Sequence, residues 1–283
     1  MYKSIRLIIN EPVAENAEIV SAFFGNLGFE SFQEGSLHEA FINSISFNEE
    51  DSSLMVKQLF ELNLIQSIGK FTDQKKINWN AEWESNFEPV YVPNLCYIRA
   101  HFHKPLEASE KLKEIVITPK MSFGTGHHAT TYQMIEALGN MSLSNKSCLD
   151  MGTGTGILGI YAIMEGAHKI LAIDNDDWCV TNTIENMEVN HISEEQMSVE
   201  LGEELPVQMR NKFELVVANI NRNVLLAQIS SYARVLKPKG ELLLSGFHPE
   251  DFQALHKECL KNEFKLINRT EKDTWVMLQY QYA

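Results

Sequence analysis

Long apolar runs, paired cysteines and clusters of basic residues are all missing from this sequence of 283 residues. No apolar segment approaches the ~18 residues that a membrane-spanning helix needs, and the first twelve residues lack the apolar core of a signal peptide. The four cysteines show no Cys-x-x-Cys spacing, which would indicate a redox or metal site. We therefore expect a cytoplasmic protein with reduced thiols and no membrane partner.

Positive charge is also scarce, because 24 Lys and Arg residues face 38 Asp and Glu residues, giving a formal net charge of −14. Nucleic-acid binding depends on clustered Lys and Arg, so we expect no direct contact with nucleic acid. The imbalance is uneven, with three bases and ten acids in residues 1–64. Two explanations remain open: a surface that keeps the protein in solution, or a surface for a basic protein partner.

The sequence divides into three parts. Periodicities in residues 1–72 predict the order β-α-β-β-α-β of a small ferredoxin-like α+β domain. Residues 73–89 are charged, contain two tryptophans and predict a connecting helix. From residue 90 to 283, strands alternate with helices, which predicts an α/β domain with a parallel sheet and a closing antiparallel hairpin. The helix expected over Glu49–Asn63 carries four apolar residues that we place on its inner side: Leu54, Leu59, Phe60 and Leu62.

A strand, a glycine turn and a helix follow one another in the stretch KSCLDMGTGTGILGIYAIMEGA, residues 146–167. Gly152, Gly154 and Gly156 stand at alternate positions after Asp150, and an apolar helical run follows. Such a turn brings backbone N–H groups close to a ligand. The next apolar run ends at Asp174, where a carboxylate can accept hydrogen bonds from both ribose hydroxyls. The pattern indicates a site for an adenosine-containing cofactor.

The spacing of the glycines bears on which cofactor binds. A dinucleotide fingerprint reads G-x-G-x-x-G, but Ile157 stands where its last glycine would fall. An acid at Asp150 would repel a pyrophosphate and attract a cation. S-adenosylmethionine has no phosphate and carries a sulfonium and an ammonium, so the charges favour it over NAD. Whether Asp150 contacts the ligand or caps the glycine turn stays open.

Several segments together resemble the ribosomal protein L11 methyltransferases: SFGTGHHATT, LDMGTGTGILGI, AIDND, VVANI and VLKPKGELLLSG. The resemblance extends over essentially the whole chain and includes the connector WNAEWESNFEP. It implies a small N-terminal substrate-recognition domain joined to a seven-stranded, Rossmann-like methyltransferase domain. The implied reaction moves methyl groups from S-adenosylmethionine to lysine side chains and/or the N-terminal amine of ribosomal protein L11. We expect the protein to act as a monomer.

The resemblance also assigns roles to residues. Thr131 and Phe123 would bind the methionine end of the cofactor, Phe123 from a covering loop that also contains His127. Gly152 and Gly154 would approach the cofactor closely, and Asp174 would bind its ribose. Asn219 would lie beside the methyl group, both as a cofactor-binding and as the catalytic residue. The family often has Asp-Pro-Gly before the covering loop, whereas this chain has Thr118-Pro119-Lys120.

Some of these residues also allow other interpretations. The side chains of His127 and His128 point in different directions because the two residues are adjacent. No third ligand lies nearby in the sequence, so we expect no metal. Thr130 with Gln133 fits a capping box at a helix start. No residue stands out as a general base. A nicotinamide-dependent oxidoreductase and a non-catalytic cofactor-binding scaffold remain as alternative functions.

Overall fold

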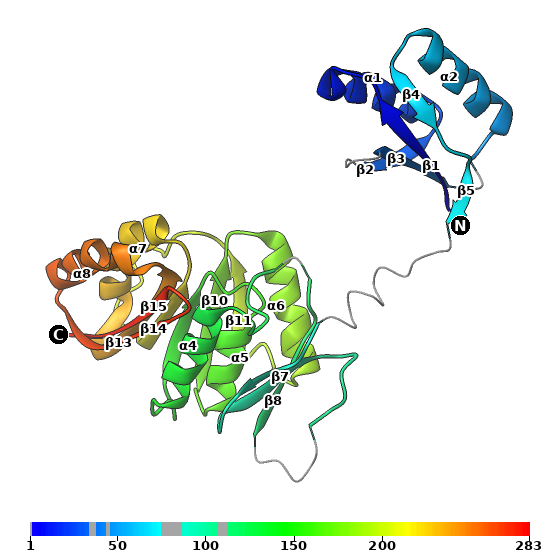
Figure 1. The fold of residues 1–283 in the computed structure, drawn as a ribbon. Helices are drawn as coiled ribbons and strands as arrows, with labels where there is room; N and C mark the ends of the chain where they lie inside the picture. Colours follow the sequence, from blue (N-terminus) through cyan, green and yellow to red (C-terminus); the bar gives the residue numbers. More distant parts are fainter. Residues whose placement is uncertain (1, 34–37, 44–45, 75–86, 107–111, 121) are drawn as a thin grey trace. The chain divides into compact units, whose positions relative to one another are not determined.

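The computed structural model describes residues 2–33, 38–43, 46–74, 87–106, 112–120 and 122–283. The chain forms two compact units, residues 1–86 and residues 87–283 (Figure 1). The connecting helix expected within residues 73–89 falls mostly on residues 75–86, which lie outside the described residues. None of the described helices is both long and apolar enough to cross a bilayer.

The small unit is an antiparallel sheet with two helices. Its elements in chain order are β1 (Tyr2–Ile9), α1 (Val13–Asn26), β2 (Phe29–Gln33), β3 (His38–Asn43), α2 (Glu49–Glu61), β4 (Ile65–Ile68) and β5 (Thr72–Gln74). The strands are arranged β2-β3-β1-β4, and β5 also pairs with β1. This order and the β-α-β-β-α-β sequence confirm the ferredoxin-like fold.

The buried side of α2 differs from the one that its leucines suggested. Asn48 caps the helix by accepting hydrogen bonds from the N–H groups of the first turn. The buried side chains are Ser52, Met55 and Leu59, spaced three and four residues apart as one face of a helix requires. The prediction was correct for Leu59 but wrong for three others, which are exposed: Leu54, Phe60 and Leu62.

The large unit begins with a small sheet of its own. It consists of β6 (Val90–Val92), β7 (Cys96–Ala100) and β8 (Lys113–Ile117), in that order. β6 and β7 are antiparallel, whereas β7 and β8 are parallel. The sequence indicated strands here but not that they form a separate sheet.

The central sheet has seven strands in the order β11-β10-β9-β12-β13-β15-β14. Its elements with the intervening helices are α4 (Ala129–Gly139), β9 (Ser147–Met151), α5 (Ile157–Met164), β10 (Lys169–Asp174), α6 (Asp177–Val189), β11 (Met197–Leu201), β12 (Phe213–Asn219), α7 (Arg222–Val235), β13 (Leu236–Phe247), η1 (Pro249–Asp251), α8 (Phe252–Lys261), β14 (Phe264–Lys272) and β15 (Trp275–Tyr282). Strands β9 to β13 are parallel, and β15 is antiparallel to both neighbours. The predicted seven-stranded, Rossmann-like sheet is confirmed.

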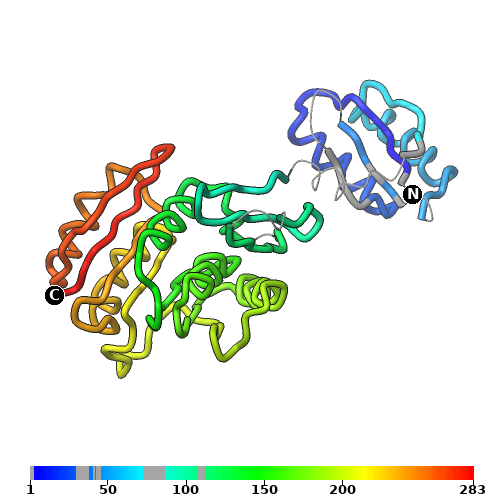
Figure 2. Tube along the Cα trace, turned by 90° about the horizontal axis from the view of Figure 1, so that it is seen from below, coloured from blue at the N-terminus to red at the C-terminus, as the bar shows by residue number. Residues whose placement is uncertain are grey.

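Helices cover both faces of this sheet (Figure 1). Alternate residues of the buried strands pack on opposite sides. On β12, Leu215 and Val217 join the core beneath α4 and α5, while Val216 and Ala218 join the core beneath α7 and α8. The hairpin of β14 and β15, orange to red in Figure 2, forms one edge of the sheet. All four cysteines are free thiols.

Candidate functional site

Three strands of the central sheet end side by side. Met151 of β9 pairs with Ile173 of β10 and with Ala218 of β12. Gly152, Asp174 and Asn219 therefore follow at the same level of the sheet. The chain proceeds from β9 to β10 on one side and returns to β12 on the other, so this edge is the topological switch point, where open α/β sheets bind ligands.

The glycine turn makes close contacts that a larger residue would prevent. Gly152 has φ +73°, and a Cβ there would lie 2.1 Å from Cγ2 of Ile220. Gly154 has φ +59°, and a Cβ there would lie 2.3 Å from the carbonyl oxygen of Phe123. Both positions therefore require glycine for conformation as well as for space. The turn, here called the cradle, donates the N–H groups of residues 152–156 to acceptors within the protein, and Gly152 lines the cavity beside it.

Asp150 is buried beneath the glycine turn and is hydrogen-bonded to it. It is only 1% exposed, and its Oδ2 accepts hydrogen bonds from the Thr153 hydroxyl (2.8 Å) and the Gly159 N–H (3.2 Å). Burial raises the pKa of this carboxyl from 3.8 to about 6, although both hydrogen bonds lower it; the charge of Asp174 raises it further. Of the two roles left open, capping the glycine turn is the one that these contacts provide.

Asp174 has access to the cavity beside the turn. Its Oδ2 accepts a hydrogen bond from the Gly154 N–H (2.8 Å) and its Oδ1 from the Asp176 N–H (3.1 Å). Each oxygen keeps a further lone pair for a ligand. Asp176 in turn caps α6 by accepting from the Trp178 N–H. The acid that would bind a ribose is thus held by the glycine turn and by the start of α6.

A cavity of about 490 Å³ lies against these strand ends. Of the predicted site residues, Gly152 and Asp174 line it. Its other acidic lining residues are Glu203 and Glu204, which follow β11. Thr131, Gly154, Phe123 and Asn219 are not in its lining, so the cavity corresponds to one part of the proposed site.

Two of the predicted ligand-binding residues have buried polar atoms without a partner. The Thr131 hydroxyl and the Asn219 Oδ1 have no hydrogen-bond partner among the described residues. The same holds for the Tyr161 hydroxyl and the Asn182 Oδ1. Because buried polar groups are normally hydrogen-bonded, an unpaired atom at a strand end or helix start indicates a place for a ligand group.

The start of α4 differs from the capping box that the sequence suggested. The N-cap is His128, whose Nδ1 accepts a hydrogen bond from the Thr130 N–H (3.3 Å). Gln133 instead donates to the carbonyl oxygen of Trp275 (3.0 Å) and accepts from the Thr270 hydroxyl (2.8 Å). These tertiary partners replace the local one, so the Thr130–Gln133 prediction was wrong.

An aromatic wall, which the sequence did not reveal, stands beside this helix start. The wall consists of Phe123, His128, Trp275 and His248, whose successive ring centroids are 5.1, 4.7 and 4.1 Å apart. Burial, and then the charge of His248, lowers the pKa of His128. The Nδ1–H of His248 donates to the carbonyl oxygen of Thr274 (2.9 Å). Phe123 and His128 come from one segment, but His248 and Trp275 each come from distant parts of the chain, so no local spacing could have indicated the wall.

The two adjacent histidines contact different parts of the chain. His127 Nε2 contacts the carbonyl oxygen of Glu88 (2.7 Å), and His128 faces Thr130. Within the described ranges, no group of three or more His, Cys, Asp or Glu residues is arranged to hold a metal ion.

Known proteins resemble the chain over most of its length. The family model described as ribosomal protein L11 methyltransferase (PrmA) matches residues 17–283. The ribosomal protein L11 methyltransferase of Phocaeicola vulgatus is 40% identical over 93% of this chain and 92% of its own. The protein of that name from Bacteroides thetaiotaomicron is 37% identical over 94% of each chain. In fold, the chain resembles the ribosomal protein L11 methylase of Lactobacillus delbrueckii subsp. bulgaricus, with a TM-score of 0.64 and 24% identity, over 70% of this chain and 100% of that one.

Proposed function

Because the chain belongs to the ribosomal protein L11 methyltransferase (PrmA) family, we propose that it transfers methyl groups from S-adenosylmethionine to amines of ribosomal protein L11. The acceptors in this proposal are lysine side chains and/or the N-terminal amine. Residues 90–283 would carry out the transfer, residues 1–72 would receive the protein substrate, and residues 73–89 would connect them. The excess of acids over bases in residues 1–64 supports a basic partner for the small unit.

The observation that carries the proposal is the unpaired Oδ1 of Asn219 at the switch point of the sheet. It ends β12, next to the strand whose end carries Gly152. The Thr131 hydroxyl, which has no hydrogen-bond partner among the described residues, offers the same cofactor a polar contact. Gly152 of the cradle lines the cavity in which the cofactor would lie. We assign cofactor binding to Gly152, Gly154, Asp174, Thr131, Phe123 and Asn219.

The charge of the cavity favours this cofactor over a dinucleotide. Three carboxylates line it, those of Asp174, Glu203 and Glu204, against one cation, Arg234. The excess of carboxylates repels a pyrophosphate, whereas S-adenosylmethionine carries no phosphate. The acids therefore support S-adenosylmethionine over a nicotinamide dinucleotide.

When bound, the cofactor would supply a methyl group on a positively charged sulfur. A neutral amine nitrogen would bond to the methyl carbon as the sulfur–carbon bond breaks, and the methylated amine would then release a proton to solvent. A lysine amine with a pKa of ~10.4 is almost fully protonated near neutral pH, so the site must favour its neutral form. In the aromatic wall, His128, His248 and Trp275 are partly buried and Phe123 is exposed. A substrate that covered the wall would remove water from around the amine, and loss of hydration disfavours the charged form. The Asn219 Oδ1 would accept a hydrogen bond from the amine N–H and so orient its lone pair.

Replacement of Asn219 tests the proposal. We expect Asn219→Ala to retain binding of S-adenosylhomocysteine while kcat falls by roughly 10²-fold, the size typical for loss of one orienting group. Asn223→Ala, an exposed change in the first turn of α7, is the control and should leave both quantities unchanged. Transfer is measured by mass spectrometry of ribosomal protein L11 after incubation with the enzyme and cofactor.

Two results would contradict the proposal. Unmethylated ribosomal protein L11 after incubation with the intact protein would exclude the activity. Equal turnover by Asn219→Ala would remove Asn219 from the mechanism while leaving the activity in place.

A further inference from the structure

Three asparagines lie one turn apart on α6: Asn182, Asn186 and Asn190, the last being its C-cap residue. Residues spaced four apart share one face of a helix. Asn182 and Asn186 are 1% and 0% exposed, although asparagine is usually a surface residue. Buried carboxamide groups are normally hydrogen-bonded, so the partners of these asparagines reveal what this face of α6 holds.

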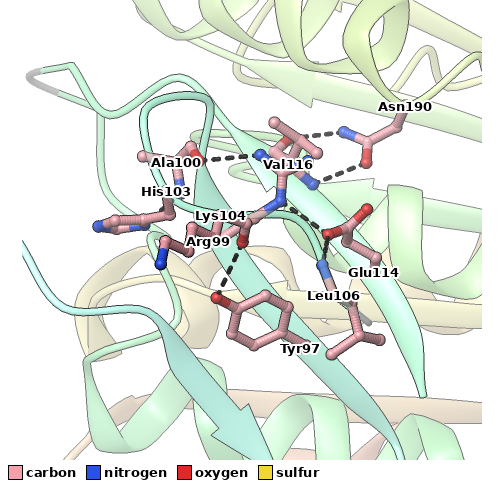
Figure 3. Close-up of polar contacts among 9 residues, drawn as sticks. All are labelled: Tyr97, Arg99, Ala100, His103, Lys104, Leu106, Glu114, Val116 and Asn190. Atoms are coloured by element: carbon pink, nitrogen blue, oxygen red, sulfur yellow. Dashed lines mark hydrogen bonds and ion pairs between the residues drawn. The ribbon is translucent and has the colours of Figure 1, made fainter. Parts of the chain in front are cut away.

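The asparagines hold the backbone at and beyond the end of β8. Asn190 accepts a hydrogen bond from the Val116 N–H (2.8 Å) and donates to the Val116 carbonyl oxygen (2.6 Å), as Figure 3 shows. Asn186 Oδ1 accepts from the Thr118 N–H (2.8 Å), and Asn182 donates to the Thr118 carbonyl oxygen (3.1 Å). The side chains of α6 thus act as the strand partner of residues 116 and 118.

Asn186 alone of the three also reaches the glycine turn. Its Nδ2 donates to the carbonyl oxygen of Thr155 (2.8 Å). Thr155 makes two further bonds, from its N–H to the Phe123 carbonyl oxygen (3.0 Å) and from its hydroxyl to the Gly124 carbonyl oxygen (2.5 Å). Residues 118–120 and 122–124, here called the strap, are therefore joined to the glycine turn at both ends, at one end through Asn186.

The strap and the glycine turn are in direct contact, next to Gly152, which lines the cavity. The Phe123 carbonyl oxygen sits 2.3 Å from the position of a Cβ on Gly154, so these two backbones are packed against each other. Phe123 also begins the aromatic wall through His128. A displaced strap would therefore change both the cradle and the wall.

We propose that Asn186 is a positioning residue for methyl transfer, whose carboxamide fixes the strap against the glycine turn in the cofactor-binding arrangement. This inference rests on the proposed function for its ligand. Further side-chain bonds join the strap to α6. Asn182 donates to the Thr118 carbonyl oxygen but makes no bond to the glycine turn within the described residues. The ion pair of Lys120 with Glu185 is more than one-third exposed and contributes little because solvent screens it. Asn186 is buried and connects two backbones at once.

A matched pair of variants tests this inference. Asn186→Ala and Asn190→Ala each remove a carboxamide that holds the β8 segment from the same face of α6, but only Asn186 contacts the glycine turn. We expect Asn186→Ala to weaken S-adenosylhomocysteine binding and raise the KM for S-adenosylmethionine roughly tenfold, equivalent to ~1.4 kcal/mol. Asn190→Ala should lower the Tm while binding the ligand within about twofold of the wild type. The affinity is measured by calorimetry.

Asn186→Asp keeps the acceptor for the Thr118 N–H but cannot donate to the Thr155 carbonyl oxygen. This variant tests the same inference if Asn186→Ala does not fold. We expect this folded variant to lose affinity as well, with a larger effect on KM than on kcat. Wild-type affinity in both Asn186 variants, or an equal loss in Asn190→Ala, would overturn the inference. Failure of the wild-type protein to bind S-adenosylhomocysteine would instead overturn the proposed function.

Discussion

Replacing Asp150 by asparagine measures the free energy of keeping a charge beneath the glycine turn. Both hydrogen bonds to Asp150 reach the same oxygen, Oδ2, so the carboxamide oxygen of asparagine can accept both. The substitution therefore removes the charge with little change in shape. Burial raises the pKa of the carboxyl from 3.8 to about 6. At ~1.36 kcal/mol per pH unit, this difference corresponds to about 3 kcal/mol of stability.

The sign of the effect follows from proton binding. A carboxyl with a raised pKa binds its proton more tightly in the folded than in the unfolded protein. The stability gained from the protonated Asp150 carboxyl is complete below pH 3.8 and is lost as the pH rises through about 6. We therefore expect the free energy of unfolding of the wild type to fall, relative to Asp150→Asn, by about 2 kcal/mol between ~pH 4 and ~pH 7.

Urea unfolding at a series of pH values measures this difference. Asp176→Asn is the control, because it removes one charge at the surface and keeps a side chain that caps α6 equally well. Subtracting its effect corrects for the change in net charge. A stability difference between Asp150→Asn and the wild type that does not vary between pH 4 and pH 7 would refute the reasoning.

Two further substitutions test the cofactor cradle. Gly154→Ala places a Cβ 2.3 Å from the Phe123 carbonyl oxygen at φ +59°, so we expect a loss of at least ~1–2 kcal/mol in thermal unfolding and no calorimetric binding of S-adenosylhomocysteine. Binding at wild-type affinity would contradict this. Asp174→Asn removes the charge that strengthens hydrogen bonds to ribose hydroxyls, and we expect roughly tenfold weaker binding in the same titration. A change of less than twofold would exclude this role.

The parts of the site that the sequence predicted are those that depend on neighbouring residues. Gly152, Gly154 and Asp174 follow apolar runs of strand length, and a parallel sheet brings the ends of such strands together. The glycine turn is local, because its conformation arises within five residues. The alternation of strands with helices predicted a parallel sheet with a closing antiparallel hairpin. The seven strands followed from the resemblance, and the separate sheet of β6, β7 and β8 was not predicted.

The parts that it missed depend on contacts between distant segments. Trp275 and His248 meet His128 only because β15 pairs beside β13 and α4 packs on β15. Asn186 resembles any polar residue of an exposed helix until its partners at Thr118 and Thr155 are known. On α2, residue type suggested one face for burial, but the packing against the sheet selected the face of Met55. Tertiary packing overrode local preference in each case.

The amides of α6 also protect the protein from unwanted association. β8 is an edge strand of its small sheet, and an edge strand with unpaired N–H and C=O groups can add a strand from another molecule. The Asn190 side chain is hydrogen-bonded to both the N–H and the C=O group of Val116. The side chains of Asn186 and Asn182 bond the N–H and the C=O group of Thr118, respectively. An incoming strand would have to displace three side chains before it could pair, so this edge resists aggregation without charge or proline at the blocked positions.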